Sequence, residues 1–134
     1  MFTTRRDYKS VDRHLEEFGL LPYKTTLAWE LPHSLKQRLE IMMLILSEAR
    51  VILLDEPTAG MSPSETAETA DLIRHVRSSF DASVLVIEHD MSFVRNLDCP
   101  MIVMIKGAVV REGSYDDIKD DPEIRKAYLG ERQC

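Results

Sequence analysis

The fold of this chain is decided by one stretch of sequence, which reads Val51-Ile52-Leu53-Leu54-Asp55-Glu56-Pro57-Thr58. It begins as a continuous aliphatic run and ends abruptly in two adjacent carboxylates. An apolar run bounded by charge and proline is typical of a central strand in a parallel sheet, whose two faces are both covered. Ligands of open α/β sheets bind at the carboxyl ends of such strands. The stretch therefore predicts a buried strand that carries Asp55 and Glu56 to a ligand site.

Two carboxylates in that position can divide the chemistry of a phosphate site. Asp55 would hold Mg²⁺ on a nucleotide, and Glu56 would orient or deprotonate a water molecule. The alternative is a strand end that is acidic without any functional role, because short motifs also match by chance.

A second apolar run, Ser83-Val84-Leu85-Val86-Ile87, is followed by Glu88-His89-Asp90. A histidine at the tip of this strand could contact a γ-phosphate or the attacking water from the side opposite Glu56. The alternative for His89 is a helix-capping or hydrogen-bonded surface histidine, which is the commoner case.

The order of three motifs resembles the nucleotide-binding subunits of ABC transporters, and within them the ATPases of branched-chain amino acid and urea importers. The motifs are Leu-Leu-Asp-Glu-Pro-Thr-Ala-Gly-Met at 53–61, Ile-Glu-His-Asp-Met at 87–91 and Lys-Gly-Ala-Val-Val-Arg-Glu-Gly at 106–113. The segment 121–130 looks like the ending of the branched-chain amino acid group. The resemblance runs from about Val11 to the end, but it covers only the second half of the family's domain.

The resemblance implies a role for several residues. Asp55 matches the metal-binding end of the Walker B strand, Glu56 matches the catalytic base, and His89 matches the switch histidine. The residues that match the D-loop, which faces the partner subunit in this family, are Ala59, Gly60, Met61 and Ser62. The cofactors implied are ATP and Mg²⁺, as used by the full-length family.

The sequence contains no G-x-x-x-x-G-K-[ST] motif around any of its five glycines. In P-loop proteins this motif supplies the backbone amides, the lysine and the hydroxyl that hold the phosphates and the metal. We therefore expect a partial P-loop NTPase fold that lacks the Walker A half. Because Asp55 and Glu56 offer only negative charge to a negative ligand, we also expect the chain alone neither to bind ATP·Mg²⁺ nor to hydrolyse ATP.

The family's signature motif, close to Leu-Ser-Gly-Gly-Gln, is degenerate here. The matching residues are Leu31, Pro32, His33, Ser34 and Leu35. The family uses this serine and these glycine amides to contact the γ-phosphate on the opposite subunit, at a helix start that favours anions. Pro32 removes a hydroxyl and a backbone donor, and Leu35 replaces a polar side chain. The alternative interpretation is a plain helix entry with Pro32 near its first turn.

Composition fits one ordinary soluble domain. The chain has 134 residues, of which 44% are hydrophobic and 30% charged, and its formal net charge is -6. That charge argues against a nucleic-acid surface. So does the sequence pattern, which has no basic stripe with interleaved aromatics. The longest apolar run, 41–46, is far shorter than the about 20 residues of a membrane helix. With no signal-peptide core, the chain is expected to be cytoplasmic. The resemblance implies that it could also be peripheral at the inner face of the membrane, through permease subunits. Cys99 and Cys134 are expected to be reduced thiols.

The alternation of helical and strand patterns predicts a mostly parallel sheet flanked by helices. We expect residues 1–33 to form an N-terminal tail and a remnant of the helical subdomain, and residues 34–134 to form the C-terminal half of the ABC ATPase core. A helix from about Ser34 to Ser47 is apolar almost all round, which predicts deep burial. Another helix is expected over Val11–Phe18, ended by Gly19. The capping box of Ser62 and Glu65 should begin a further helix, which carries one apolar stripe: Ala67, Ala70, Ile73, Val76 and Phe80. The remaining expected elements are a helix capped by Asp90, a hairpin across Lys106-Gly107, and helices after Ser114 and from Pro122.

Two functions fit these patterns. The first is a truncated ATP-binding cassette of an ABC importer, inactive alone. The second is a non-catalytic interaction or regulatory module derived from such an ATPase. Because the upstream half of the domain is missing, we expect one face of the 51–54 strand and much of the 41–46 helix to be uncovered. Uncovered apolar surface predicts a homodimer or larger assembly, a complementary P-loop half, or another ABC ATPase subunit as partner. The transported solute cannot be predicted from this chain.

Overall fold

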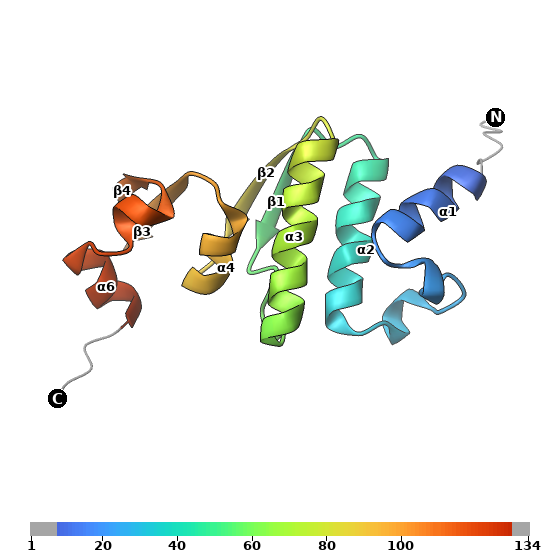
Figure 1. Ribbon diagram of the computed structural model, residues 1–134, viewed down its shortest axis with the longest axis horizontal. Coiled ribbons are helices and arrows are strands. Elements are labelled where there is room, and N and C mark those ends of the chain that lie inside the picture. Colours follow the sequence, from blue (N-terminus) through green and yellow to red (C-terminus); the bar gives the residue numbers. More distant parts are fainter. Residues whose placement is uncertain (1–7, 130–134) are drawn as a thin grey trace. The chain divides into compact units, whose positions relative to one another are not determined.

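The computed structural model describes residues 8–129, and the side chains of residues 11–127. The chain divides into two compact units, Met1–Val86 and Ile87–Cys134, and each is described by itself. Helices and strands alternate along most of the chain, in the order expected for an α/β fold (Figure 1). Cys134 and residues 1–7 lie outside the described residues.

The first unit opens with a helical segment. Helix α1 spans Tyr8–Glu17 and is followed by the 3-10 turns η1, Leu21–Tyr23, and η2, Ala28–Glu30. As predicted, Gly19 follows the end of α1, and its φ of 69° is in the left-handed region that terminates helices. Phe18 is fully buried beside this end.

Helix α2, His33–Leu46, confirms the helix expected from about Ser34 to Ser47. Its predicted deep burial is wrong. Ile41 and Met42 are buried, whereas the large apolar side chains exposed along its last turns are Met43, Leu44 and Leu46. The helix is apolar all round, but the described residues cover only one of its sides.

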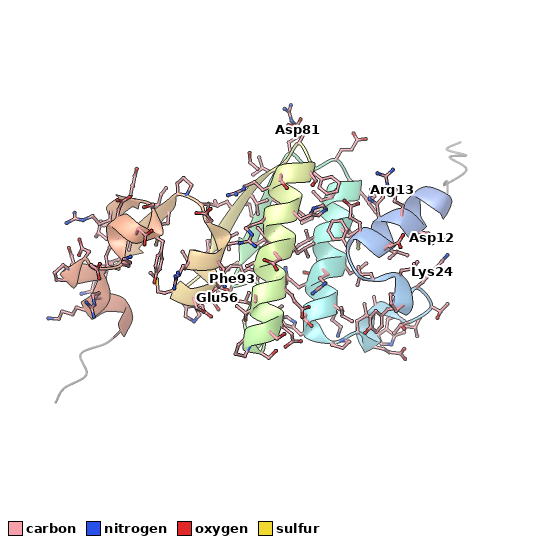
Figure 2. The ribbon with its side chains drawn as sticks, viewed as in Figure 1. Asp12, Arg13, Lys24, Glu56, Asp81 and Phe93 are labelled. Carbon is pink, nitrogen blue, oxygen red and sulfur yellow. The ribbon has the colours of Figure 1, made fainter. Side chains whose placement is uncertain are left out.

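Strand β1, Val51–Asp55, and strand β2, Ser83–Ile87, form a two-stranded parallel sheet. They are connected by helix α3, Pro63–Ser79, which lies along the sheet (Figure 1). Glu56 and Asp81 are at opposite ends of this strand pair, as parallel strands require (Figure 2). The carboxyl end of β1 is therefore the end that carries the two acids.

The predicted burial of both faces of β1 is wrong in this chain. Ile52 and Leu54 are buried, but Val51 and Leu53 are 63% and 69% exposed. Since side chains alternate between the two faces of a strand, one face of β1 is covered and the other is open. This confirms the second expectation, that one face of the strand is uncovered, because no described segment lies over Val51 and Leu53.

Helix α3 begins as predicted and packs slightly differently. Ser62 is its N-cap and Glu65 completes the capping box, with Pro63 in the first turn. Ala70, Ile73 and Val76 are buried as expected. Ala67 is exposed and Phe80 follows the helix end, so the buried stripe is instead completed by Thr66, Thr69 and Leu72.

The second unit contains helix α4, the hairpin β3–β4 and two short helices. The bounds are Met91–Leu97 for α4, Met101–Ile105 for β3, Ala108–Gly113 for β4, Tyr115–Ile118 for α5 and Pro122–Leu129 for α6. The hairpin is antiparallel, with an irregularity between Val103 and Met104. The small hydrophobic core of this unit is formed by Val103 of β3, Ile118 of α5 and Ile124 of α6. The hairpin and all three helices were predicted from the sequence.

Candidate functional site

The two acids of the first motif lie at the open end of β1. Asp55 is the last residue of the strand, and both Asp55 and Glu56 are exposed. Glu56 has a φ of 45°, which is unusual for a residue with a side chain. Its carbonyl accepts a hydrogen bond from the Ala59 amide at 3.1 Å, so the chain turns sharply directly after the strand. The turn leaves both carboxylates at the edge of the sheet, where the sequence predicted a ligand site.

The residues that follow form a tight segment leading into α3. Pro57 and Thr58 are buried, and the Met61 amide donates to the Thr58 carbonyl at 3.1 Å. Gly60 has a φ of 73°, a conformation that glycine adopts without strain. The D-loop residues expected from the resemblance, Ala59, Gly60, Met61 and Ser62, therefore form the connection between the acids of β1 and the start of α3.

The degenerate signature residues lie at the start of α2. Pro32 is the N-cap of this helix, and its carbonyl accepts hydrogen bonds from the Leu35 and Lys36 amides. Leu31 and Ser34 are buried, whereas Pro32 and His33 are exposed. The local geometry is that of the plain helix entry which the sequence left open as an alternative.

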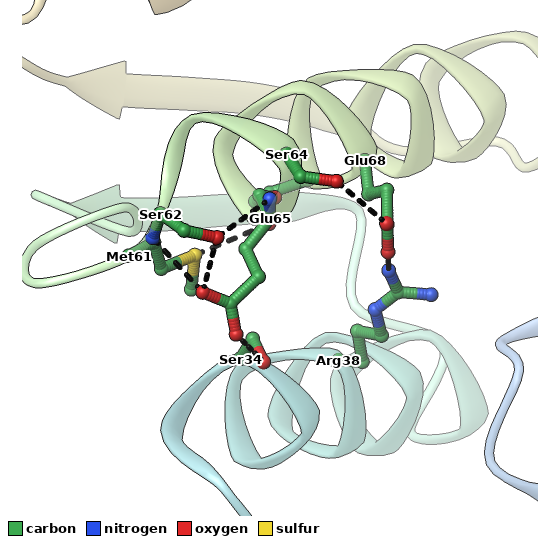
Figure 3. A network of polar contacts seen from close by, with 8 residues as sticks. Ser34, Arg38, Met61, Ser62, Ser64, Glu65 and Glu68 are labelled. Carbon is green, nitrogen blue, oxygen red and sulfur yellow. Dashed lines mark hydrogen bonds and ion pairs between the residues drawn. The ribbon is translucent and has the colours of Figure 1, made fainter.

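A polar network joins the start of α2 to the start of α3 (Figure 3). The Ser34 hydroxyl donates to Oε1 of Glu65 at 2.7 Å. Oε2 of the same carboxylate accepts from the Ser62 amide at 2.9 Å and from the Ser62 hydroxyl at 2.8 Å. One turn further along, Arg38 of α2 pairs with Glu68 of α3. We call the three residues Ser34, Ser62 and Glu65 the serine–glutamate clamp.

The clamp changes the ionisation of its carboxylate. The pKa of Glu65 is lowered to about 2, first by the Ser62 backbone N–H and then by the hydroxyls of Ser34 and Ser62. All three donors stabilise the charged form. Glu65 is therefore an anion at neutral pH and holds the start of α2 and the start of α3 together.

The second motif ends in a different local arrangement, in the second unit. The Glu88 carboxylate accepts from the amides of His89 and Asp90, at 3.0 and 3.3 Å. Asp90 caps α4 through the Ser92 and Phe93 amides, as predicted. Hydrogen bonding, first from the Ser92 hydroxyl, lowers the pKa of Asp90. The bonds to Glu88 hold the backbone at His89 and Asp90. The His89 side chain itself is 70% exposed.

Sequence reasoning missed the second role of Glu65. The Ser-x-x-Glu pattern predicted its bond to Ser62, but nothing in the pattern connects it with Ser34, which is 31 residues away in the chain. Glu88 was also missed, although its position between the strand and His89 could have indicated a structural role.

The described part of the chain contains no transmembrane segment, since none of its helices is both long and apolar enough. It also has no group of three or more acidic, histidine or cysteine side chains that could hold a metal ion. A hollow of about 450 Å³ is lined by residues that include Arg50, Phe80 and Asp81, which come just before β1 and β2 and not at the carboxyl end of β1 that bears Asp55 and Glu56. The candidate site is the exposed end of β1, with Asp55 and Glu56.

No protein-family profile matches the chain. It is 38% identical, over 117 residues, to the high-affinity branched-chain amino acid transport ATP-binding protein BraF of Pseudomonas aeruginosa, and this match covers 87% of the chain and 46% of BraF. It is 35% identical to the corresponding protein LivG of Escherichia coli strain K12, with the same coverage.

Solved structures show the same fold. The chain superposes on MJ1267, an ATP-binding cassette of an ABC transporter, with a TM-score of 0.83 and 22% identity, over 97% of this chain and 53% of that one. It spans about half the length of the curated relatives that it matches. The chain is thus homologous to part of an ABC transporter ATP-binding subunit of the branched-chain amino acid importer type, and its α/β fold is a partial form of that ATPase domain.

Proposed function

We propose that this chain provides one half of an ATP-binding cassette, the half that carries the Walker B acids, the D-loop and the switch histidine. The observation that supports this most is the position of Asp55 and Glu56, exposed at the carboxyl end of a parallel strand. The matched relatives are named as branched-chain amino acid transport proteins. We therefore propose the same class of solute for the complete assembly.

The residues present fit one side of an Mg²⁺–nucleotide site. Mg²⁺ is usually held in proteins by one or two carboxylates together with phosphate oxygens, and Asp55 can supply such a carboxylate. Glu56 would orient and deprotonate the attacking water. By resemblance, His89, which belongs to the second unit, is proposed as the residue that contacts the γ-phosphate or that water.

The phosphate side of the site does not fit this chain alone. Phosphates need backbone amides, a lysine and a hydroxyl in a glycine-rich loop, and the sequence lacks that motif. We therefore propose that the isolated chain neither binds ATP·Mg²⁺ nor hydrolyses ATP. Titration calorimetry tests this directly, and a micromolar affinity for ATP·Mg²⁺ would contradict it.

We propose that hydrolysis requires a polypeptide that supplies the P-loop. The completed cassette would pair head to tail with a second cassette and attach to permease subunits at the cytoplasmic face of a membrane. In such a dimer the segment Leu31–Leu35 would face the nucleotide of the opposite cassette. Pro32 lacks both a hydroxyl and an amide donor there, so we expect slow turnover.

The second candidate is a non-catalytic module that binds or regulates another ATPase subunit. The observation that favours it is the serine–glutamate clamp. The Ser34 hydroxyl donates to Glu65 of the same chain. This bond joins α2 to α3, and the hydroxyl is therefore not presented to a phosphate.

A chimera distinguishes the two candidates. The chain is fused behind the P-loop half of BraF, and phosphate release is measured with and without the repairs Pro32→Ser, Ser34→Gly and Leu35→Gln. Regaining preorganised donors should raise the rate on the order of a hundredfold. Glu56→Gln should abolish the gain while preserving nucleotide binding, whereas Glu112→Gln, an exposed acid of β4, is the matched control.

Each outcome of the chimera experiment decides one assignment. If the repaired chimera is no faster than the unrepaired one, the signature interpretation is wrong. If Glu56→Gln and Glu112→Gln give equal rates, Glu56 is not the base. If no version of the chimera releases phosphate, although each binds nucleotide, the non-catalytic module is the better description.

A further inference from the structure

A buried carboxylate comes directly before the exposed histidine of the second unit. The Glu88 side chain is 3% exposed, whereas the His89 side chain is 70% exposed. Oε2 of Glu88 accepts hydrogen bonds from the backbone N–H of His89 at 3.0 Å and of Asp90 at 3.3 Å. The same oxygen lies 3.8 Å from Nδ1 of the His89 imidazole. One oxygen atom therefore faces both the backbone and the ring of His89.

The backbone bonds determine where this oxygen lies. Burying a carboxylate is costly unless hydrogen-bond donors surround it, and two of the donors here belong to the peptides that flank His89. They hold the Glu88 side chain against the chain segment between β2 and α4. The position of the carboxylate relative to the imidazole is therefore set by the backbone and not by a freely rotating side chain.

The carboxylate on the other side of His89 is directed to a different element. Oδ1 of Asp90 accepts hydrogen bonds from the backbone N–H of Ser92 and Phe93 and from the Ser92 hydroxyl, all in the first turn of α4. Asp90 thus caps a helix, whereas Glu88 lies against the ring nitrogen of His89. The two acids have separate roles.

The position of the Glu88 carboxylate favours one form of the imidazole. A neutral imidazole carries its proton on one of its two nitrogens, and the group beside each nitrogen decides which. A negative oxygen beside Nδ1 favours the form with the proton on Nδ1. Nε2 of the neutral ring is then a hydrogen-bond acceptor. It can accept from a water molecule, but it can donate to a phosphate oxygen only if the ring takes up a second proton.

His75, in the first unit, has the opposite arrangement. Its Nε2 lies 2.8 Å from Oε1 of Glu17, and its Nδ1 lies 3.2 Å from the Ser79 hydroxyl. The carboxylate favours a proton on Nε2, and Nδ1 can then accept from the hydroxyl. His75 and His89 should therefore be opposite tautomers in the same chain, and each serves as a reference for the other.

We propose that Glu88 is a positioning residue for His89: it keeps the proton on Nδ1 and so makes Nε2 the nitrogen that acts on the ligand. The tautomer is a property of this chain alone, whereas the action of Nε2 rests on the proposed function. In that function the neutral ring accepts a hydrogen bond from the attacking water, which selects the water over the γ-phosphate as its contact.

Heteronuclear NMR of the isotope-labelled chain tests the tautomer without nucleotide or turnover. The spectra are recorded at a pH of about 8, above the range in which imidazoles usually titrate. We expect His89 to be mainly the Nδ1–H form and His75 mainly the Nε2–H form. Glu88→Gln keeps an oxygen for the two backbone N–H groups but removes the charge. It should lower the ratio of Nδ1–H to Nε2–H at His89 by roughly fivefold, a modest factor for a charge at this distance beside an exposed ring.

Glu112→Gln is the matched control, because Glu112 is an exposed acid of β4 in the same unit. It should leave the ratio at His89 unchanged, and Asp90→Asn, which keeps an oxygen for the cap of α4, should change it less than Glu88→Gln does. Equal ratios in Glu88→Gln and Glu112→Gln would overturn the proposal, and so would an equal effect of Asp90→Asn. If Glu88→Gln does not fold, the parent chain still decides: His89 mainly in the Nε2–H form would overturn the proposal.

The repaired chimera separates this inference from the proposed function. Glu88→Gln should lower kcat roughly twofold, because the working tautomer becomes the minor form, and should leave nucleotide affinity unchanged. In a His89→Ala background it should have no effect, since Glu88 acts through the ring. An undiminished effect in that background would overturn the positioning role. If the tautomer responds to Glu88→Gln but every chimera binds nucleotide without releasing phosphate, the positioning of His89 is retained and the proposed function is rejected.

Discussion

Helices α3 and α5 begin with the same local motif, but only α3 uses it to bind a distant part of the chain. Ser62 and Glu65 form the capping box of α3, and Ser114 and Asp117 form that of α5. The backbone bonds are alike, at 2.9 Å for Ser62 to Glu65 and 3.1 Å for Ser114 to Asp117. The difference lies in what else the carboxylate binds.

The difference is that the Glu65 carboxylate also has a partner on a second helix. Both bonds from Ser114 end on the same oxygen of Asp117. Glu65 likewise accepts both bonds from Ser62 at one oxygen, Oε2, and its Oε1 accepts a further bond from Ser34 of α2. The capping box of α5 is a local feature, whereas that of α3 also connects two helices, α2 and α3.

The largest expected effect comes from removing the two carboxylates in turn. Glu65→Ala deletes the bonds to both Ser62 and Ser34, whereas Asp117→Ala deletes only the bonds to Ser114. We expect Glu65→Ala to lower the Tm of the first unit roughly twice as much as Asp117→Ala lowers that of the second, because it removes partners on two helices. Thermal unfolding followed by circular dichroism, with hydrogen exchange to assign each unit, measures this. Equal effects would mean that the bond to Ser34 contributes nothing.

Ser34→Ala tests the long-range bond alone and leaves the capping box intact. Ser34 is only 8% exposed, and a hydrogen bond from such a group to a carboxylate contributes about 1 kcal/mol or somewhat more. We expect a loss of about 1 kcal/mol in the free energy of unfolding, measured by urea denaturation. Ser34→Gly, the repair used in the chimera, should lose at least as much, because glycine also weakens a helix.

The comparison also shows what the sequence can and cannot predict. The capping box of Ser62 and the cap at Asp90 follow from residues within four positions of each other, and both were predicted. The bond between Ser34 and Glu65 depends on how α2 packs against α3, which no local pattern encodes. Burial at Val51 and Leu53 was predicted wrongly for a related reason. Their sequence is suited to a sheet with two covers, and the chain supplies only one of them.

Ser114→Ala should have a smaller and strictly local effect. In a helix as short as α5 an N-cap substitution should cost about 0.5 kcal/mol, the low end of the usual range, and among the described residues the Ser114 hydroxyl is hydrogen-bonded only to Asp117 of its own helix. We expect faster hydrogen exchange in the first turn of α5 and no change in α2 or α3. Faster exchange at the start of α2 in this variant would contradict the distinction between the two capping boxes.

The smallest expected effect is a difference in pH dependence between wild type and Glu65→Gln. The pKa of Glu65 is lowered from 4.5 to about 2 in the folded chain, first by the Ser62 backbone N–H. Between these values the unfolded chain binds more protons than the folded chain, so stability rises with pH. The contribution of Glu65 is therefore complete above pH 4.5 and is lost as the pH falls towards 2. Solvent screens a carboxylate at the surface, which keeps the effect modest.

Wild type should lose stability over this window more steeply than Glu65→Gln, as measured by urea denaturation at a series of pH values. Asp117→Asn is the control, because the pKa of Asp117 is also lowered, first by the Ser114 hydroxyl, but its loss should alter only the second unit. If wild type and Glu65→Gln have parallel profiles, the clamp does not depend on the charge of Glu65, and its hydrogen bonds act as neutral ones.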